Sequence, residues 1–298
     1  MRRALLAITS LVLGLTAIGV HAQQQMTVFA KIVDGTGKPA EKVEPGDITI
    51  TENGAAAKVI KIEPVNWPTK VQILIDNGTG TGSDNLVNIR NGVKGLIEAL
   101  PEGTEVTLVT TAPQPRIVVK PTTDRAAQLK GIDLLTPDSG AGRFVESLNE
   151  ALGRIEKDKT DYFPTIISLA TTSGDTNNLE NSYNQLLKRL QTRPATVHVV
   201  MYSKSTGSSV GGATQTEVGI NVTKYVRGRF EAIAVGSRLA TLLPEFGAMV
   251  AKSHEAQAHQ FRITATRPDG AKGNVSNLSM STRSGLATTA VSMDGRIP

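Results

Sequence analysis

The sequence contains no cysteine, few aromatic residues and no long run of like charges. Without cysteine the chain forms no disulfide and offers no thiol nucleophile, so its stability must come from a hydrophobic core. Aromatic residues make up 4% of the chain, which disfavours a face of stacked rings for binding carbohydrate or single-stranded nucleic acid. The formal net charge of +5 is too small for the concentrated basic face of a nucleic-acid-binding protein.

The first residues have the pattern of a secretory signal peptide. Met1-Arg2-Arg3 is followed by an apolar stretch and by the small-x-small-like junction Val20-His21-Ala22. We therefore expect residues 1–22 to be removed and the protein to be exported, either to the periplasm or out of the cell. An uncleaved N-terminal anchor is the alternative. No later apolar stretch is long enough to span a bilayer, so we expect no membrane contact after cleavage.

Hydrophobic periodicity divides the remaining chain into three segments. Residues 23–66 alternate like β-strands, with a tight hairpin at Glu52-Asn53-Gly54. Residues 67–256 alternate between strands and amphipathic helices, and residues 257–298 return to a β-pattern. We expect the two outer segments to pack together as a small β-sandwich-like module, with the α/β domain inserted between them. The strands expected in the outer segments are 26–33, 47–51, 58–63, 260–265, 275–281 and 286–292.

The middle segment has the pattern of a doubly wound α/β domain. Val71 to Ile75 is an almost continuous apolar run, as expected for a central strand covered on both faces. Alternation of such strands with helices of 3.6-residue period favours a mostly parallel sheet. Pro244 lies within the last helix and is expected to kink or split it. The expected strands are 71–75, 105–110, 116–120, 165–170 and 196–202, and the expected helices are 86–100, 144–155, 179–190 and 239–250.

Two loops follow core strands, at the edge where open α/β sheets bind their ligands. The first runs from Asp76 to Asp84 and contains three alternating glycines, and the second covers residues 170–177. The Gly-x-Gly-x-Gly spacing is a weak match to a nucleotide-binding loop, because the fingerprint is Gly-x-Gly-x-x-Gly and Asp76 would repel a phosphate.

The first loop resembles the metal-binding segment of the von Willebrand factor A family. In that family the first core strand ends in Asp-x-Ser-x-Ser, which coordinates a magnesium-type ion together with a distant threonine and a second aspartate. Here residues 76–80 read Asp-Asn-Gly-Thr-Gly, so both serine positions are glycine. The turn at residues 139–143 lacks the family's threonine, and Thr172 stands where the second aspartate would be. The resemblance implies the family's α/β fold with a degenerate metal site.

A hard cation requires several oxygen ligands held in a fixed geometry. The ligands that this sequence could still offer are Asp76, Thr79, Thr172 and Asp175. We expect no cofactor, in which case Asp76 accepts hydrogen bonds within its own loop. Binding of Mg²⁺ or another divalent cation by these substitute ligands is the alternative.

A narrower resemblance covers most of the chain. Residues 45–54, Pro-Gly-Asp-Ile-Thr-Ile-Thr-Glu-Asn-Gly, are similar to the opening of the acidobacterial VWFA-related family, in which a β-strand segment precedes the A domain. Residues 228–231 and 259–263 are similar to the C-terminal half of that family. The resemblance implies an exported binding module, not a reaction.

The sequence does not assemble a catalytic set, since it lacks a Gly-x-Ser-x-Gly nucleophile elbow and its histidines are not spaced as a pair. We expect a non-catalytic module that binds a protein partner, as an adhesin or a scaffold, through a polar rim at the carboxyl edge of the sheet. Residues 203–212 are expected to add a mobile loop to this rim. A metal-dependent adhesin and a cryptic hydrolase are the alternatives. The residues expected in the rim are Asn77, Gly78, Gly80, Ser83, Gly142, Arg143, Thr171, Ser173, Ser205 and Ser208.

Overall fold

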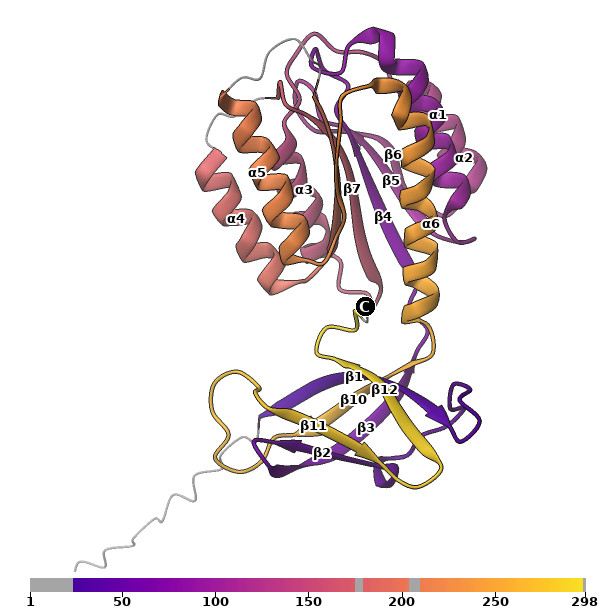
Figure 1. Ribbon diagram of the computed structural model, residues 1–298, viewed down its shortest axis with the longest axis vertical. Coiled ribbons are helices and arrows are strands. Elements are labelled where there is room, and N and C mark those ends of the chain that lie inside the picture. The colour runs from indigo at the N-terminus through magenta and orange to yellow at the C-terminus, as the bar shows by residue number, and fades with distance from the viewer. Residues whose placement is uncertain (1–23, 175–178, 204–209, 297–298) are drawn as a thin grey trace, which may run out of the picture.

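The computed structural model describes residues 24–174, 179–203 and 210–296 and contains two modules (Figure 1). An α/β domain lies at one end, and a small β-module formed by N- and C-terminal strands lies at the other. The chain enters the α/β domain after β3 (Ala55–Val65) and leaves it after α6 (Leu239–Gln257). The α/β domain is therefore inserted between the two halves of the β-module, as the sequence predicts.

The β-module is a six-stranded antiparallel sheet with the order β11-β2-β3-β10-β1-β12. Its central pairs, β1 with β10 and β10 with β3, join strands from opposite ends of the sequence. A short turn at residues 283–285 connects the two edge strands β11 and β12, so the sheet curls around one core. The other strands are β1 (Gln25–Asp34), β2 (Ile48–Glu52), β10 (Gln260–Thr266), β11 (Leu278–Thr282) and β12 (Leu286–Ser292).

The alternation of β1 places its side chains on two different surfaces. Val28, Ala30 and Ile32 are fully buried in the core of the β-module, whereas Phe29 faces the other way and packs against the α/β domain. The β2–β3 hairpin turns through Asn53 and Gly54, with φ of 51° and 82°. Positive φ at both central residues is the backbone that an Asn-Gly turn favours, so the predicted hairpin is confirmed.

The α/β domain has a six-stranded sheet with the order β6-β5-β4-β7-β8-β9. All neighbouring strands are parallel except β5 and β6, which are antiparallel. The central strand β4 is buried on both faces, and the predicted doubly wound, mostly parallel sheet is confirmed. The strands are β4 (Thr69–Ile75), β5 (Glu105–Thr110), β6 (Arg116–Thr122), β7 (Phe163–Thr171), β8 (Thr196–Tyr202) and β9 (Phe230–Ile233).

Helices cover both faces of this sheet (Figure 1). α1 (Leu86–Ala99), α2 (Arg125–Lys130) and α6 lie on one face, where α1 and α6 share a core with β4 and β5. α3 (Phe144–Lys157), α4 (Leu179–Thr192) and α5 (Val210–Tyr225) lie on the other. Four short 3-10 helices complete the described chain: η1 (Pro45–Asp47), η2 (Ser83–Asn85), η3 (Gly131–Leu134) and η4 (Gly236–Arg238). In the described ranges, no helix combines the length and hydropathy needed to cross a membrane.

Two local expectations differ in detail from the structure. Pro244 does not split α6, which continues through it as one helix. α6 packs closely on α1, since a Cβ added at Gly92 would lie 2.4 Å from the carbonyl oxygen of Leu239. The predicted loop 203–212 ends earlier than expected, because α5 begins at Val210. Residues 204–209 of that loop lie outside the described residues.

Candidate functional site at the carboxyl edge of the parallel sheet

The parallel strands β4, β7 and β8 end at the edge of the sheet that points away from the β-module (Figure 1). The loops that begin at Asp76, Thr172 and Ser203 follow these strands directly. The backbone N–H of Thr172 donates to the carbonyl of Tyr202, and that of Asp76 donates to the carbonyl of Leu169. The two predicted loops are therefore brought together at this edge, which we call the carboxyl edge.

Asp76 is the only carboxylate of the proposed metal ligands within the described residues, and it is 2% exposed. Its Oδ1 accepts a 2.9 Å hydrogen bond from the backbone N–H of Gly78, and its Oδ2 accepts a 2.6 Å hydrogen bond from the hydroxyl of Thr171. Burial raises the pKa of Asp76 above its ordinary value, and these hydrogen bonds oppose the shift. Both carboxylate oxygens thus already have partners within the protein.

Glycine backbones fill the space around this carboxylate. A Cβ added at Gly142 would lie 2.3 Å from Cγ of Asp76, and one added at Gly80 would lie 2.4 Å from Oγ1 of Thr171. At Gly78, a Cβ would lie 2.4 Å from the carbonyl oxygen of Gly140. Two of these glycines occupy the serine positions of the Asp-x-Ser-x-Ser motif. The close packing explains why no larger residue fits at them.

The remaining proposed metal ligands do not converge on Asp76. Thr79 is exposed and ties its loop to residue 140 through its backbone N–H, which donates to the Gly140 carbonyl at 3.0 Å. The Thr172 hydroxyl lies 3.5 Å from that of Ser203, and the neighbouring Thr171 is the threonine that reaches Asp76. Asp175 lies outside the described residues. In the part of the chain that the structure describes, His, Asp and Glu side chains form no cluster of three that could hold a metal.

A hard cation needs more oxygen ligands than this arrangement supplies. Among the described residues, the loop offers one buried carboxylate that is already hydrogen-bonded and glycines in place of two hydroxyls. The described residues therefore fit a divalent cation poorly, and the geometry instead makes Asp76 the anchor of its loop.

Half of the residues expected in the contact rim are buried instead. Asn77 donates from Nδ2 to the carbonyl of Thr136 and accepts at Oδ1 from the N–H of Ala112, which anchors the first loop to its neighbours. The buried residues shape the edge from within and offer no exposed side chain to a partner. They are Asn77, Gly78, Gly80, Gly142 and Thr171.

Three members of the predicted rim do reach the surface. Ser83 and Ser173 are exposed, and Arg143 is half-buried with its Nε donating to the carbonyl of Pro113. Ser205 and Ser208 lie outside the described residues.

Two exposed valines at this edge are not predicted from the sequence. Val87 and Val235 are 66% and 62% exposed. Gly236, which follows Val235, packs against Asn85, which lies two residues before Val87: a Cβ added at Gly236 would lie 1.7 Å from Oδ1 of Asn85. Asn85 in turn donates to the hydroxyl of Tyr202 at the end of β8. In α1, Val87 lies off the buried stripe, and that mismatch with the helical period is the signal that could have identified it.

Neither a protein-family model nor a curated protein matches this sequence. Solved structures do match the fold. A von Willebrand factor type A protein from Catenulispora acidiphila is 12% identical, with 91% of this chain and 74% of that chain covered and a TM-score of 0.50. BatB from Bacteroides thetaiotaomicron is 13% identical, with 62% and 100% covered and a TM-score of 0.46. The vWF domain of the type V pili tip protein Mfa5 from Porphyromonas gingivalis is 12% identical, with 62% and 96% covered and a TM-score of 0.47.

Proposed function

We propose that this chain, whose α/β domain has the von Willebrand factor A fold, is an exported, non-catalytic module that binds a protein partner through its carboxyl edge without a metal ion. The observation that carries the proposal is the state of Asp76, whose carboxylate is buried, hydrogen-bonded at both oxygens and packed against Gly142. A carboxylate held in this way stabilises the edge and is not free to coordinate a cation.

The surface at this edge has the composition of a protein contact. Thr79, Ser83 and Ser173 expose hydroxyl groups, and Val87 and Val235 expose apolar side chains at the same edge of the domain. Protein interfaces combine an apolar centre with a polar rim that forms hydrogen bonds to the partner. The two valines supply the centre and the hydroxyl groups supply the rim.

Catalysis at this edge is not supported by the described side chains. A hydroxyl nucleophile requires an adjacent general base, and the Thr171 hydroxyl that does adjoin a carboxylate is buried together with Asp76, away from solvent. His198 and His254 line a cavity that also contains residues of the β-module, at the other end of the domain. The edge therefore supports binding without turnover.

A thermal melt tests the metal-independent part of the proposal. The purified protein is melted with EDTA, Mg²⁺, Mn²⁺ or Ca²⁺, beside Asp76→Ala. A cation bound only to the folded state at about one hundred times its Kd would add about 2.7 kcal/mol of apparent stability. We expect the same Tm with every additive. A shift with one ion that disappears in Asp76→Ala would contradict the proposal and favour a metal-dependent adhesin.

Site-specific photo-cross-linking tests the binding edge. A photoreactive amino acid replaces Ser173 at the carboxyl edge or, as the matched control, the exposed Ser281 of the β-module. We expect a discrete cross-linked protein from position 173 only, with a lower yield when Val235→Asp is added. Equal cross-linking from both positions, or cross-linking from position 281 alone, would place the partner elsewhere.

A further inference from the structure

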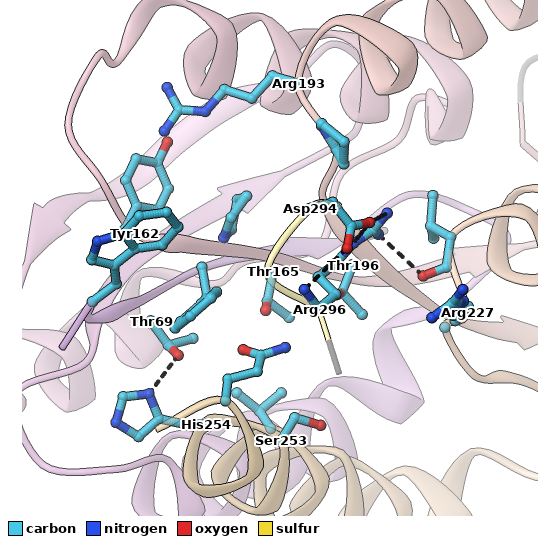
Figure 2. A pocket seen from close by; sticks show the side chains of 18 of the residues that line it. Thr69, Tyr162, Thr165, Arg193, Thr196, Arg227, Ser253, His254, Asp294 and Arg296 are labelled. Atoms are coloured by element: carbon cyan, nitrogen blue, oxygen red, sulfur yellow. Dashed lines mark hydrogen bonds and ion pairs between the residues drawn. The ribbon is translucent and has the colours of Figure 1, made fainter. Parts of the chain in front are cut away.

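A cavity of about 640 Å³ lies between the amino end of the parallel sheet and the β-module, at the opposite end of the α/β domain from the proposed binding edge. Its walls come from both modules and from the residues that follow β12. This volume is in the range of sites that enclose small organic molecules, and boundaries between domains are common places for such sites. Figure 2 shows the side chains around it.

One wall of the cavity is aromatic. Phe29 of β1, Trp67 of the β3–β4 connection and Phe163 of β7 pack together, with ring centroids 5.3 and 5.4 Å apart for successive pairs. Tyr162 extends this wall, and the guanidinium of Arg193 lies over its ring at 4.7 Å from the centroid. This wall can take the flat face of a ring or another apolar group.

Three buried polar side chains that line the same cavity each keep a polar atom without a hydrogen-bond partner among the described residues. Thr165 and Gln257 are 6% and 7% exposed, and neither side chain has a partner in the described part of the chain. His198 is 4% exposed. Its Nδ1 accepts a 3.0 Å hydrogen bond from the backbone N–H of Arg229, so the proton of the neutral ring is on Nε2. The free polar atoms of these side chains open on the cavity, where a bound ligand can form hydrogen bonds with them.

The charges around the cavity favour an anion. Each lining carboxylate is already paired with an arginine: Glu156 with Arg189, Asp161 with Arg262, and Asp294 with Arg296. By contrast, Lys159, Arg193 and Arg227 line the cavity without a carboxylate partner among the described residues. Figure 2 shows Arg193 and Arg227 on different sides of the cavity, with the paired Asp294 and Arg296 between them.

The walls are held in place by contacts between the modules. Arg262 of β10 pairs with Asp161, which precedes β7, at 2.9 Å. Arg296 donates to the carbonyls of Ala195 and Val226, so the segment after β12 returns to the α/β domain. Gln260 also holds this segment, because its Nε2 donates to the carbonyl of Gly295. A cavity fixed by such contacts requires little rearrangement to bind a ligand.

We propose that this cavity is a binding site for a small organic anion with an aromatic body. The ring packs against Trp67 and Tyr162, and the positive charges of Arg193, Arg227 and Lys159 around the cavity attract the acidic group. The buried hydroxyl, amide and imidazole N–H of Thr165, Gln257 and His198 form hydrogen bonds to the polar atoms of the ligand.

Trp67 gives a direct readout, because it is the only tryptophan of the chain and it lines the cavity. Its fluorescence is followed while the purified protein is titrated with phenylacetate, phenyl phosphate, neutral phenylacetamide or inorganic phosphate. We expect a saturable change with phenylacetate or phenyl phosphate, and the tighter of the two identifies the acidic group. Phenylacetamide is expected to bind at least about tenfold more weakly, and inorganic phosphate is expected to leave the emission unchanged.

Variants locate the site. Arg227→Gln and Thr165→Val are each expected to weaken binding of the preferred anion by about tenfold, whereas Arg116→Gln, at an exposed position on β6, is the matched control without effect. A lack of saturable change up to about 10 mM of either anion, equal binding of the amide, or affinities unaffected by both variants would overturn the proposal. These outcomes are independent of the proposed partner, which binds at the other end of the domain.

Discussion

The hydroxyl of Thr171 donates a 2.6 Å hydrogen bond to Oδ2 of Asp76, across the boundary between β7 and β4. This contact joins the two loops of the carboxyl edge and occupies a carboxylate oxygen that a metal ion would need. It also fixes the ionisation behaviour of Asp76, because the hydrogen bond only partly offsets the burial that raises the pKa.

The pH dependence of stability follows from that raised pKa. Between the ordinary pKa of aspartate, about 4, and the higher pKa in the fold, the folded protein binds a proton at Asp76 that the unfolded chain does not. The contribution of Asp76 to the free energy of unfolding therefore falls as the pH rises through this window and is constant above it. We expect Asp76→Asn to remove this fall in urea denaturation measured at a series of pH values. If the wild-type protein instead gains stability over Asp76→Asn as the pH rises, the pKa is lowered and the interpretation is wrong.

Gly142 tests the packing around the same carboxylate. In Gly142→Ala the new methyl group would lie 2.3 Å from Cγ of Asp76, so the loop or the carboxylate must move. We expect a loss of about 1–3 kcal/mol in the free energy of unfolding. Gly46→Ala is the control, because a Cβ there meets nothing within 4 Å, and its effect should stay within about 0.5 kcal/mol. Equal effects of the two substitutions would mean that the edge adapts freely.

Much of the fold follows from local patterns in the sequence. The buried run Val71 to Ile75 and the Asn53-Gly54 turn each identify their element, because burial on both faces and positive φ restrict which residues fit. α5 is different: its first turns contain Gly211 and Gly212, which disfavour helix. Its buried face, including Val218 and Val222, nevertheless packs on the sheet. Tertiary packing therefore overrides the local propensity there.

The site is less predictable, because its key contacts join distant residues. Asp76 is identifiable from its position after the first core strand, but its partner is 95 residues away. The family resemblance points to Thr172, whereas the neighbouring Thr171 makes the contact. The exposure of Asn77 is misjudged for the same reason, since Thr136 and Ala112 bury its amide. The cavity is not predictable at all, because it forms only where the two modules meet.

His198 should remain neutral well below the ordinary pH range of histidine. Burial, together with the nearby Arg229 guanidinium, lowers its pKa from 6.5 to about 4. The unfolded chain takes up a proton between these values and the folded protein does not, so His198 contributes stability above pH 6.5 that is lost as the pH falls towards 4. The full contribution is about 3 kcal/mol. NMR titration of the imidazole should show no protonation at pH 6, and a midpoint near 6.5 would contradict the burial argument.

The buried ion pair between Glu52 and Arg267 should stabilise the β-module more than the exposed ion pair between Asp47 and Arg283 does. Arg267 donates from Nε and a terminal nitrogen to the two carboxylate oxygens of Glu52, and both side chains are at most 5% exposed. Arg267→Met leaves the Glu52 charge buried without its partner, and an uncompensated buried charge is strongly destabilising. Arg283→Met is the matched control in the same module, because Arg283 pairs with Asp47 while its own side chain is 62% exposed. We expect a clearly larger fall in Tm for Arg267→Met than for Arg283→Met.

Adding Glu52→Gln should recover part of the loss in the Arg267→Met background, since it removes the charge that was left unpaired. If the double variant is no more stable than Arg267→Met alone, the loss comes from the packing of the arginine side chain and not from the unpaired carboxylate.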